Sequence, residues 1–178
     1  MLTFKAKLTI KLVAIAFTAL FVAVASLPLL GLSWHLFHGN MVSFEGRHVP
    51  VPAGFYVTQG DGGPAMWKAS FGIPFFQVPY GLISLFHRPQ GESFTFDEDY
   101  SQFKNALVQD AVDRGYKLSA ERMVPAAETR AYCLEFSRSS TPPGSLVRCA
   151  IEGSRIAVFY EGDPRYTREM FAVLEGIR

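Results

Sequence analysis

The chain has 178 residues, of which 49% are hydrophobic and 19% are charged, and its formal net charge is +1. This length fits one domain with a short appendage, and the composition excludes a largely disordered protein. A chain with so balanced a charge lacks the basic surface of a nucleic-acid-binding protein, so we expect no nucleic-acid partner. The acidic residues all lie beyond residue 44, whereas residues 1–44 carry only the basic side chains of three lysines.

The N-terminal segment predicts a membrane span. Residues 12–34 carry no charged side chain and follow Lys5, Lys7 and Lys11. In a helix rising about 1.5 Å per residue, such a run covers a hydrocarbon core of ~30 Å. The lysines predict a cytoplasmic N-terminus. We therefore expect a cytoplasmic basic segment at 1–11, a transmembrane signal-anchor at 12–34, a juncture at 35–40 and an exported domain at 41–178.

A cleaved signal peptide is the alternative interpretation of the same segment. Ala23, Val24 and Ala25 match the small-x-small pattern that precedes a cleavage site, so cleavage after Ala25 is possible in principle. The apolar run continues as far as Trp34, however, which favours the uncleaved anchor. The anchor predicts a single-pass protein of a bacterial-type inner membrane with an extracytoplasmic domain. The cleaved form predicts a periplasmic or secreted protein.

The exported part begins with short predicted strands, at 41–45, 55–58 and 65–71. Residues 71–86 carry no charge but contain two prolines and two glycines, so they are too broken to cross a membrane. One interpretation is a buried crossing that ends in a strand at 82–86. The other is an exposed contact loop that presents Phe75, Phe76 and Tyr80, because exposed apolar patches usually mark contacts with a membrane or a partner.

The next segment is the clearest helix, predicted over 97–114. Thr95 is the expected N-cap, with Glu98 completing a capping box. Gly115 is the expected residue just beyond the helix end. Apolar side chains recur at spacings of three and four and form one stripe, which comprises Tyr100, Phe103, Leu107 and Ala111.

A three-stranded meander is predicted at 132–137, 146–151 and 155–161. A second amphipathic helix closes the chain, with Asp163 as N-cap and Pro164 in its first turn. Strands and helices do not alternate strictly, which indicates an antiparallel sheet rather than a parallel one. The predicted fold class is α+β: an N-terminal transmembrane helix followed by an antiparallel β-sheet that two amphipathic helices cover.

The two cysteines predict a disulfide across one hairpin. If the chain folds symmetrically about Thr141, Cys133 lies opposite Cys149 across a five-residue loop. Directly opposed Cα atoms are ~4.5–5.5 Å apart in an antiparallel pair, which suits a disulfide. Such a bond persists in an oxidising compartment and contributes about 3 kcal/mol in the chain-entropy model. Two free buried thiols or a redox pair are the other interpretations, although no Cys-x-x-Cys motif is present.

The sequence carries no motif for other chemistry. It lacks a Gly-x-Ser-x-Gly, a P-loop, a dinucleotide fingerprint and a His-Glu-x-x-His. The histidines, at 35, 38, 48 and 87, lack the spacing of metal ligands. We therefore expect no catalytic residue, no metal and no cofactor, and a protein that is not an enzyme. An envelope enzyme without a readable motif remains the alternative.

The exported part resembles the PsbP-like α/β/α sandwich, a fold shared with DcrB-like periplasmic proteins. The resemblance rests on residues 49–57, on the strand IAVFYEG at 156–162 and on the closing helix MFAVLEGI at 170–177. It covers about residues 41–178 as a pattern of elements. The resemblance implies a protein that binds partners or assists complexes, with no catalytic residues to carry over. We therefore expect a membrane-anchored extracytoplasmic binding or accessory protein, with an envelope protein as its partner.

Overall fold

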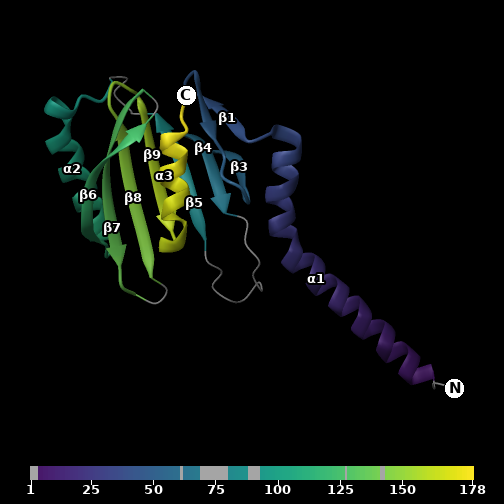
Figure 1. Ribbon diagram of the computed structural model, residues 1–178. Coiled ribbons are helices and arrows are strands. Elements are labelled where there is room, and N and C mark those ends of the chain that lie inside the picture. The colour runs from purple at the N-terminus through teal and green to yellow at the C-terminus, as the bar shows by residue number, and fades with distance from the viewer. Residues whose placement is uncertain (1–3, 61, 69–79, 88–92, 127, 141–142) are drawn as a thin grey trace.

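The computed structural model describes residues 4–60, 62–68, 80–87, 93–126, 128–140 and 143–178 (Figure 1). In its first helix, the side chains of residues 4–10 and 22–28 are not described. The elements in chain order are α1 (Phe4–His38), β1 (Met41–Phe44), β2 (Arg47–Pro50), β3 (Phe55–Gly60), β4 (Gly63–Lys68), β5 (Gly81–His87), α2 (Phe96–Asp113), β6 (Lys117–Ala126), β7 (Thr129–Arg138), β8 (Gly144–Ile151), β9 (Ile156–Gly162), the 3₁₀ turn η1 (Pro164–Tyr166) and α3 (Thr167–Glu175).

One antiparallel sheet organises the domain. Its seven strands lie in the order β3-β4-β5-β9-β8-β7-β6, and β1 and β2 form a separate hairpin. Every neighbouring pair in the sheet is antiparallel. The predicted α+β fold with an antiparallel sheet is therefore confirmed, and so is the meander, which is β7-β8-β9. Strand β5 pairs with β9 and joins the early strands to this meander.

The two faces of the sheet carry different helices. Along β7, Cys133 belongs to one buried cluster and Leu134 to another, because successive side chains of a strand point to opposite faces. The first cluster contains residues of α3 and the second contains residues of α2. Each helix therefore covers its own face, and Figure 1 shows α3 lying across one of them.

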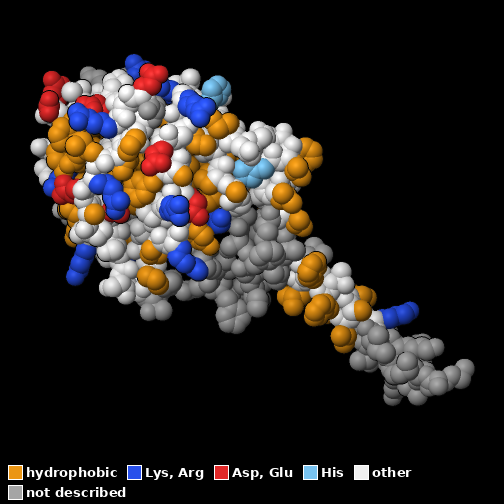
Figure 2. Space-filling model, in the orientation of Figure 1, with side chains coloured by type: hydrophobic (Ala, Val, Ile, Leu, Met, Phe, Trp, Pro, Cys, Tyr) orange, Lys and Arg blue, Asp and Glu red, His pale blue; other side chains and the backbone are white. Residues whose placement is uncertain are grey.

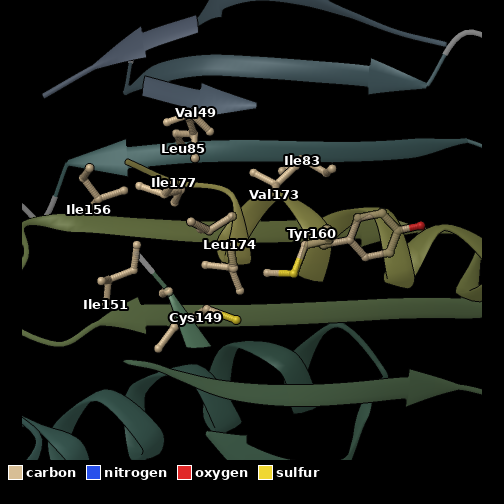
Figure 3. Packing of buried hydrophobic residues seen from close by; sticks show 14 of the residues in the cluster. Val49, Ile83, Leu85, Cys149, Ile151, Ile156, Tyr160, Val173, Leu174 and Ile177 are labelled. Carbon is tan, nitrogen blue, oxygen red and sulfur yellow. The ribbon is translucent and has the colours of Figure 1, made fainter. Parts of the chain in front are cut away.

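The main core lies between the sheet and α3. Figure 3 shows side chains from β5, β8 and β9 meeting those of α3, with Val49 of the β1-β2 hairpin closing one side. The apolar stripe of α3 is buried because it repeats at helical spacing and faces the sheet. Its fully or almost fully buried members are Met170, Val173, Leu174 and Ile177.

The smaller core lies under α2. Phe103, Leu107 and Ala111 pack against Leu134, Phe136 and Leu146 of the sheet. The predicted apolar stripe of this helix is confirmed, and so is the left-handed Gly115 after its end, at φ 77°. The predicted capping box is wrong. The backbone N–H of Thr95 donates to Asp99 Oδ2 at 2.9 Å, and the Thr95 side chain makes no cap hydrogen bond.

Two strands, β2 and β6, were not predicted from the sequence. Strand β6 is an edge strand whose side chains are mostly exposed on both faces, so its sequence lacks an apolar alternation. A register shift between Leu118 and Ala120 and a proline at Pro125 interrupt its pattern further. Both features are typical of edge strands, which must avoid pairing with another chain.

The prediction of a transmembrane signal-anchor at 12–34 is wrong. Among the residues that the structure describes, no helix combines the length and apolar character needed to cross a bilayer. Helix α1 also continues to His38, through most of the predicted juncture at 35–40.

The end of α1 belongs to the domain instead. Trp34 packs against the main core, and His35 Nε2 lies 3.2 Å from the carbonyl oxygen of Pro52. The predicted localisation as a single-pass protein of a bacterial-type inner membrane depended on the span, so it is corrected with it. The predicted contact with a membrane through an N-terminal anchor loses the same support. Cleavage after Ala25 stays a prediction.

Candidate functional site

The two cysteines form a structural disulfide in the main core. Cys133 pairs with Cys149 in the ladder of β7 and β8, their sulfur atoms are bonded, and their Cα atoms are 4.2 Å apart. The register is symmetric about residue 141, as predicted, because Arg138 pairs with Gly144 at the loop end. Neither side chain is accessible to solvent. The pair therefore holds two central strands together and offers no reactive thiol.

The predicted contact loop is only partly within the described residues. Phe75 and Phe76 lie outside them. Tyr80, just before β5, is 46% exposed, and its carbonyl oxygen accepts a hydrogen bond of 2.8 Å from the backbone N–H of Asp163. Burial against the domain, and then the nearby Glu161 carboxylate, raise the pKa of Tyr80 above its ordinary value. The contact-loop hypothesis stays a prediction.

The α2 side of the sheet is only half covered. Helix α2 packs over β6, β7 and β8, whereas the same face of β4, β5 and β9 lacks a helix in the described part of the chain. We call this uncovered area the open half-face. It presents the side chains that alternate with those of the main core, and these are Ala65, Trp67, Leu82, Ser84, Phe86, Phe159 and Glu161.

The strand register places these side chains in rows across the sheet. One row runs from Ser84 on β5 through Phe159 on β9 to Arg148 on β8 and Leu134 on β7. Leu134 is fully buried under α2, whereas Phe159 is only half-buried. Arg148 therefore stands at the boundary between the covered and uncovered halves of one face.

An apolar groove lies between α2 and the open half-face. It has a volume of about 280 Å³ and is lined by Phe86, His87, Phe103, Ala106, Leu107, Ala157 and Phe159. The rings of Phe86 and Phe159 form its floor, with their centroids 4.9 Å apart. Phe86 is 36% exposed, so this aromatic floor is accessible to a ligand. Apolar lining with few polar groups is typical of small-molecule sites.

A second, smaller groove continues from the same two rings. Its volume is about 130 Å³, and it is lined by Leu82, Ser84, Phe86, Arg148, Phe159, Tyr160 and Glu161. Phe86 and Phe159 line both grooves, so the two spaces adjoin. The smaller one differs in containing two charged side chains, which gives the apolar surface one polar end.

Arg148 is the most unusual residue of this site, because it is charged and only 7% exposed. Its guanidinium lies over the Phe159 ring, 4.3 Å from the centroid, and its Nη1 donates to the carbonyl oxygen of Tyr160 at 3.3 Å. Burial lowers the pKa of Arg148 to about 10. The side chain therefore still carries its positive charge at neutral pH.

The carboxylate that lines the same groove as Arg148, that of Glu161, forms an ion pair with another residue. Glu161 Oε1 accepts a hydrogen bond of 2.5 Å from Nη2 of Arg114, which follows the end of α2. Arg114 also lies 3.9 Å from Asp110, one helical turn earlier and mostly exposed. Among the described residues, no carboxylate forms an ion pair with Arg148. The site therefore holds a paired charge at its rim and an unpaired cation at its base.

The histidines do not gather as a metal centre in the described part of the chain. Within the described ranges, no three His, Cys, Asp or Glu side chains lie together as metal ligands would. His87 reaches the edge of the larger groove, where its Nε2 is 3.9 Å from Glu45 Oε1. The other three histidines lie at the end of α1 or in the β1-β2 hairpin.

A larger hollow beside α1 has a weaker claim to function. It measures about 580 Å³ and lies between the end of α1 and the β1-β2 hairpin, bordered by Leu32, His35, Met41 and Val51 among others. Its one ionisable side chain among those lining residues, His35, already contacts Asn40 Oδ1 at 2.9 Å. The open half-face offers the more specific chemistry, because Arg148 has no acidic partner there.

Sequence reasoning missed Arg148, Phe86 and Phe159. A signal for Arg148 was present, since it is the single charge inside the apolar strand at 146–151, and every residue of β8 is buried. An arginine at an inward position of a central strand is uncommon and needs an explanation. No comparable signal exists for Phe86 or Phe159, because the sequence does not reveal which part of a face a helix leaves uncovered.

Comparison of the chain with protein-family models and with curated proteins finds no match. The resemblance to PsbP-like and DcrB-like proteins therefore rests on the pattern of elements alone and stays a prediction. Figure 2 shows acidic and basic side chains interspersed over the face that it displays. The absence of a nucleic-acid partner also stays a prediction.

Proposed function

We propose that this protein is a non-catalytic binding module of an oxidising compartment outside the cytoplasm, and that it binds a small apolar molecule on the open half-face. The observation that carries the proposal is the groove between α2 and the Phe86–Phe159 pair, whose aromatic floor is accessible. A folded domain gains stability by covering such rings. Leaving them uncovered beside a helix is typical of a binding surface.

The dimensions of the site favour a small ligand over a protein partner. The two adjoining grooves measure about 280 Å³ and 130 Å³, and small-molecule sites in general span roughly 300–1,000 Å³. Both are concave, whereas a protein interface would need a broad surface of about 800 Å² on each side. Trp67, 38% exposed on the neighbouring strand, extends the aromatic surface beyond the grooves.

The disulfide supports the compartment. Disulfides persist in secreted and periplasmic proteins and are rare in the reducing cytosol of mesophiles. The Cys133–Cys149 bond lies in the main core and has a structural role. The disulfide therefore supports an oxidising compartment outside the cytoplasm, where such a bond forms and persists.

The proposal is tested by titration with N-phenyl-1-naphthylamine, a neutral apolar dye whose fluorescence rises in apolar surroundings. We expect saturable binding by the wild-type chain. The blocking variant is Ala106→Trp, because Ala106 lines the groove from an exposed position of α2, where a larger side chain fills the groove without disturbing the core. We expect it to weaken dye binding at least about tenfold.

The matched control is Asn105→Trp. Asn105 is the preceding exposed residue of α2 and is not among the residues that line the groove. It adds the same indole to the same helix, so the wild-type affinity should persist. Dye binding that is absent in the wild type, or equally reduced by both substitutions, would contradict the proposed function.

A further inference from the structure

We propose that the ligand of the open half-face is an amphipathic monocarboxylate, whose carboxylate binds Arg148 while its apolar body lies along the aromatic groove. This inference rests on the proposed function and adds the chemical class of the ligand. In this proposal Arg148 is the residue that determines specificity for the carboxylate.

Arg148 is buried without an acidic partner among the described residues. Moving a charge out of water is costly unless the charge is paired and hydrogen-bonded. Arg148 is 7% exposed, yet its contacts among the described residues are backbone carbonyls and the ring of Phe159. A cation over an aromatic ring recovers part of that cost. The guanidinium has five N–H donors, and its hydrogen bonds to described residues use Nη1, which leaves donors for a bidentate acceptor.

The acid nearest to Arg148 in the groove, Glu161, forms an ion pair with another arginine. Glu161 lines the same groove as Arg148, but its Oε1 accepts a hydrogen bond of 2.5 Å from Nη2 of Arg114. Among the described residues, Glu161 forms its ion pair with Arg114 and not with Arg148. The arrangement keeps the cation at the base of the groove available for an anion from outside.

The cation and the apolar groove are continuous, because they share the ring of Phe159. The Phe159 ring contacts the guanidinium on β8 and also packs against the tilted ring of Phe86, whose centroid is 4.9 Å away on β5. The same two rings line the larger groove, which α2 closes with Phe103 and Leu107. A ligand with an apolar body in that groove therefore has its polar end directed toward Arg148.

The charged groups of the smaller groove favour a ligand that carries one negative charge over a ligand that carries two. The planar fork of arginine matches carboxylates and phosphates alike. A dianionic phosphate, however, would lie in the same small groove as the Glu161 carboxylate, and like charges at short range repel. A monocarboxylate gains the bidentate contact with less repulsion, so it is the class that the site fits.

The experiment is displacement of N-phenyl-1-naphthylamine from the full chain at pH 7.5 by decanoate and by 1-decanol, which share one alkyl chain and differ in the charged group. We expect the wild type to bind decanoate at least about tenfold more tightly than decanol, because hydrogen bonds to a charged group are the stronger ones. In Arg148→Met we expect the preference for decanoate over decanol to disappear. In Arg148→Lys, which keeps a positive charge, we expect part of this preference to remain.

A second variant keeps the test valid if Arg148→Met does not fold. Arg114→Gln releases Glu161, which is then free to pair with Arg148 and compete with the ligand. Arg114 lies on the surface, with its side chain 36% exposed, so this variant should fold. We expect it to lower decanoate affinity several-fold. The control is Arg122→Met on the opposite face, where Arg122 lies over Phe171 of α3; its decanoate preference should match the wild type.

The outcomes separate the two proposals. If the dye and both alkyl ligands fail to bind, the proposed function is wrong. If decanoate and decanol displace the dye equally from the wild type, the site binds apolar molecules but the role of Arg148 is wrong. Persistence of the decanoate preference in folded Arg148→Met, or in Arg114→Gln where Arg148→Met does not fold, would also overturn the inference.

Discussion

The two faces of the sheet differ in how completely they are covered. On the α3 side, residues from β3, β4, β5, β7, β8 and β9 are buried in one continuous core, closed by α3 and by Val49 and Val51 near the hairpin (Figure 3). On the α2 side, a smaller core covers β7 and β8, and the adjoining strands present exposed rings and a buried arginine. The first face therefore supplies most of the stability, and the second has a surface available for binding.

The attachment of the two helices differs in the same way. Helix α3 is anchored by apolar side chains that are completely buried. Helix α2 adds a polar link to the edge strand β6, where Lys104 Nζ lies 2.6 Å from Glu121 Oε1 and the Tyr100 hydroxyl donates to the same carboxylate. Buried apolar area contributes about 25 cal/mol per Å², whereas exposed ion pairs contribute little. Loss of contacts on the α3 side should therefore cost more.

The largest expected effect follows from truncating one leucine on each face. Leu174→Ala on α3 should lower the free energy of unfolding by about 2–5 kcal/mol, because it opens a cavity in a fully buried position. Leu82→Ala on the open half-face should cost less than about 1 kcal/mol, since Leu82 is only half-buried. Urea unfolding followed by circular dichroism measures both. Equal losses would mean that the two faces contribute alike.

The disulfide gives the next largest effect. Replacing both Cys133 and Cys149 by alanine should lower the free energy of unfolding by about 3 kcal/mol, because the bond closes a loop between residues 16 apart. The decanoate preference should be unchanged, since both side chains face the main core. Equilibrium unfolding and the dye displacement assay measure the two quantities. A titration that finds two free thiols in the native wild type would disprove the bond.

The smallest effect concerns the polar link of α2. The hydrogen bond from Lys104, then that from Tyr100, lower the pKa of Glu121 below its ordinary value of 4.5. Because the folded-state pKa is depressed, the stabilisation is present above pH 4.5 and is lost as the pH falls through the folded-state value. Glu121→Gln should remove this part of the pH dependence and cost less than about 1 kcal/mol at pH 7, as for other exposed pairs.

Urea unfolding between pH 3 and pH 7 measures the effect of Glu121→Gln. Glu98→Gln on α2 is the control, because Glu98 lies in the first turn of the same helix and is not one of the residues that bond to Glu121. An unchanged acid limb in Glu121→Gln, or an equal change in both variants, would show that the contact between α2 and β6 does not depend on this carboxylate.

The sequence predicted the elements with the strongest local signals. The apolar stripes of α2 and α3 follow helical spacing and face the sheet as expected, that of α3 mostly buried and that of α2 partly buried. The β7-β8 register could be derived from loop length and the cysteine positions, because both constrain the same hairpin. Strand β6 could not be derived, since an exposed edge strand has little apolar alternation. The transmembrane prediction for 12–34 relied on hydropathy alone and was wrong.

By itself, the sequence determined an antiparallel α+β domain, its two amphipathic helices and the partners of its disulfide, because periodicity, turn residues and loop length are local properties of the chain. The tertiary structure decided which strands each helix covers, and therefore which rings stay accessible. Arg148 and Phe159 are 11 positions apart in sequence, and Phe86 is far from both, yet strand pairing places them side by side. A binding site of this kind depends on the area that packing leaves uncovered, and that area is a property of the whole fold.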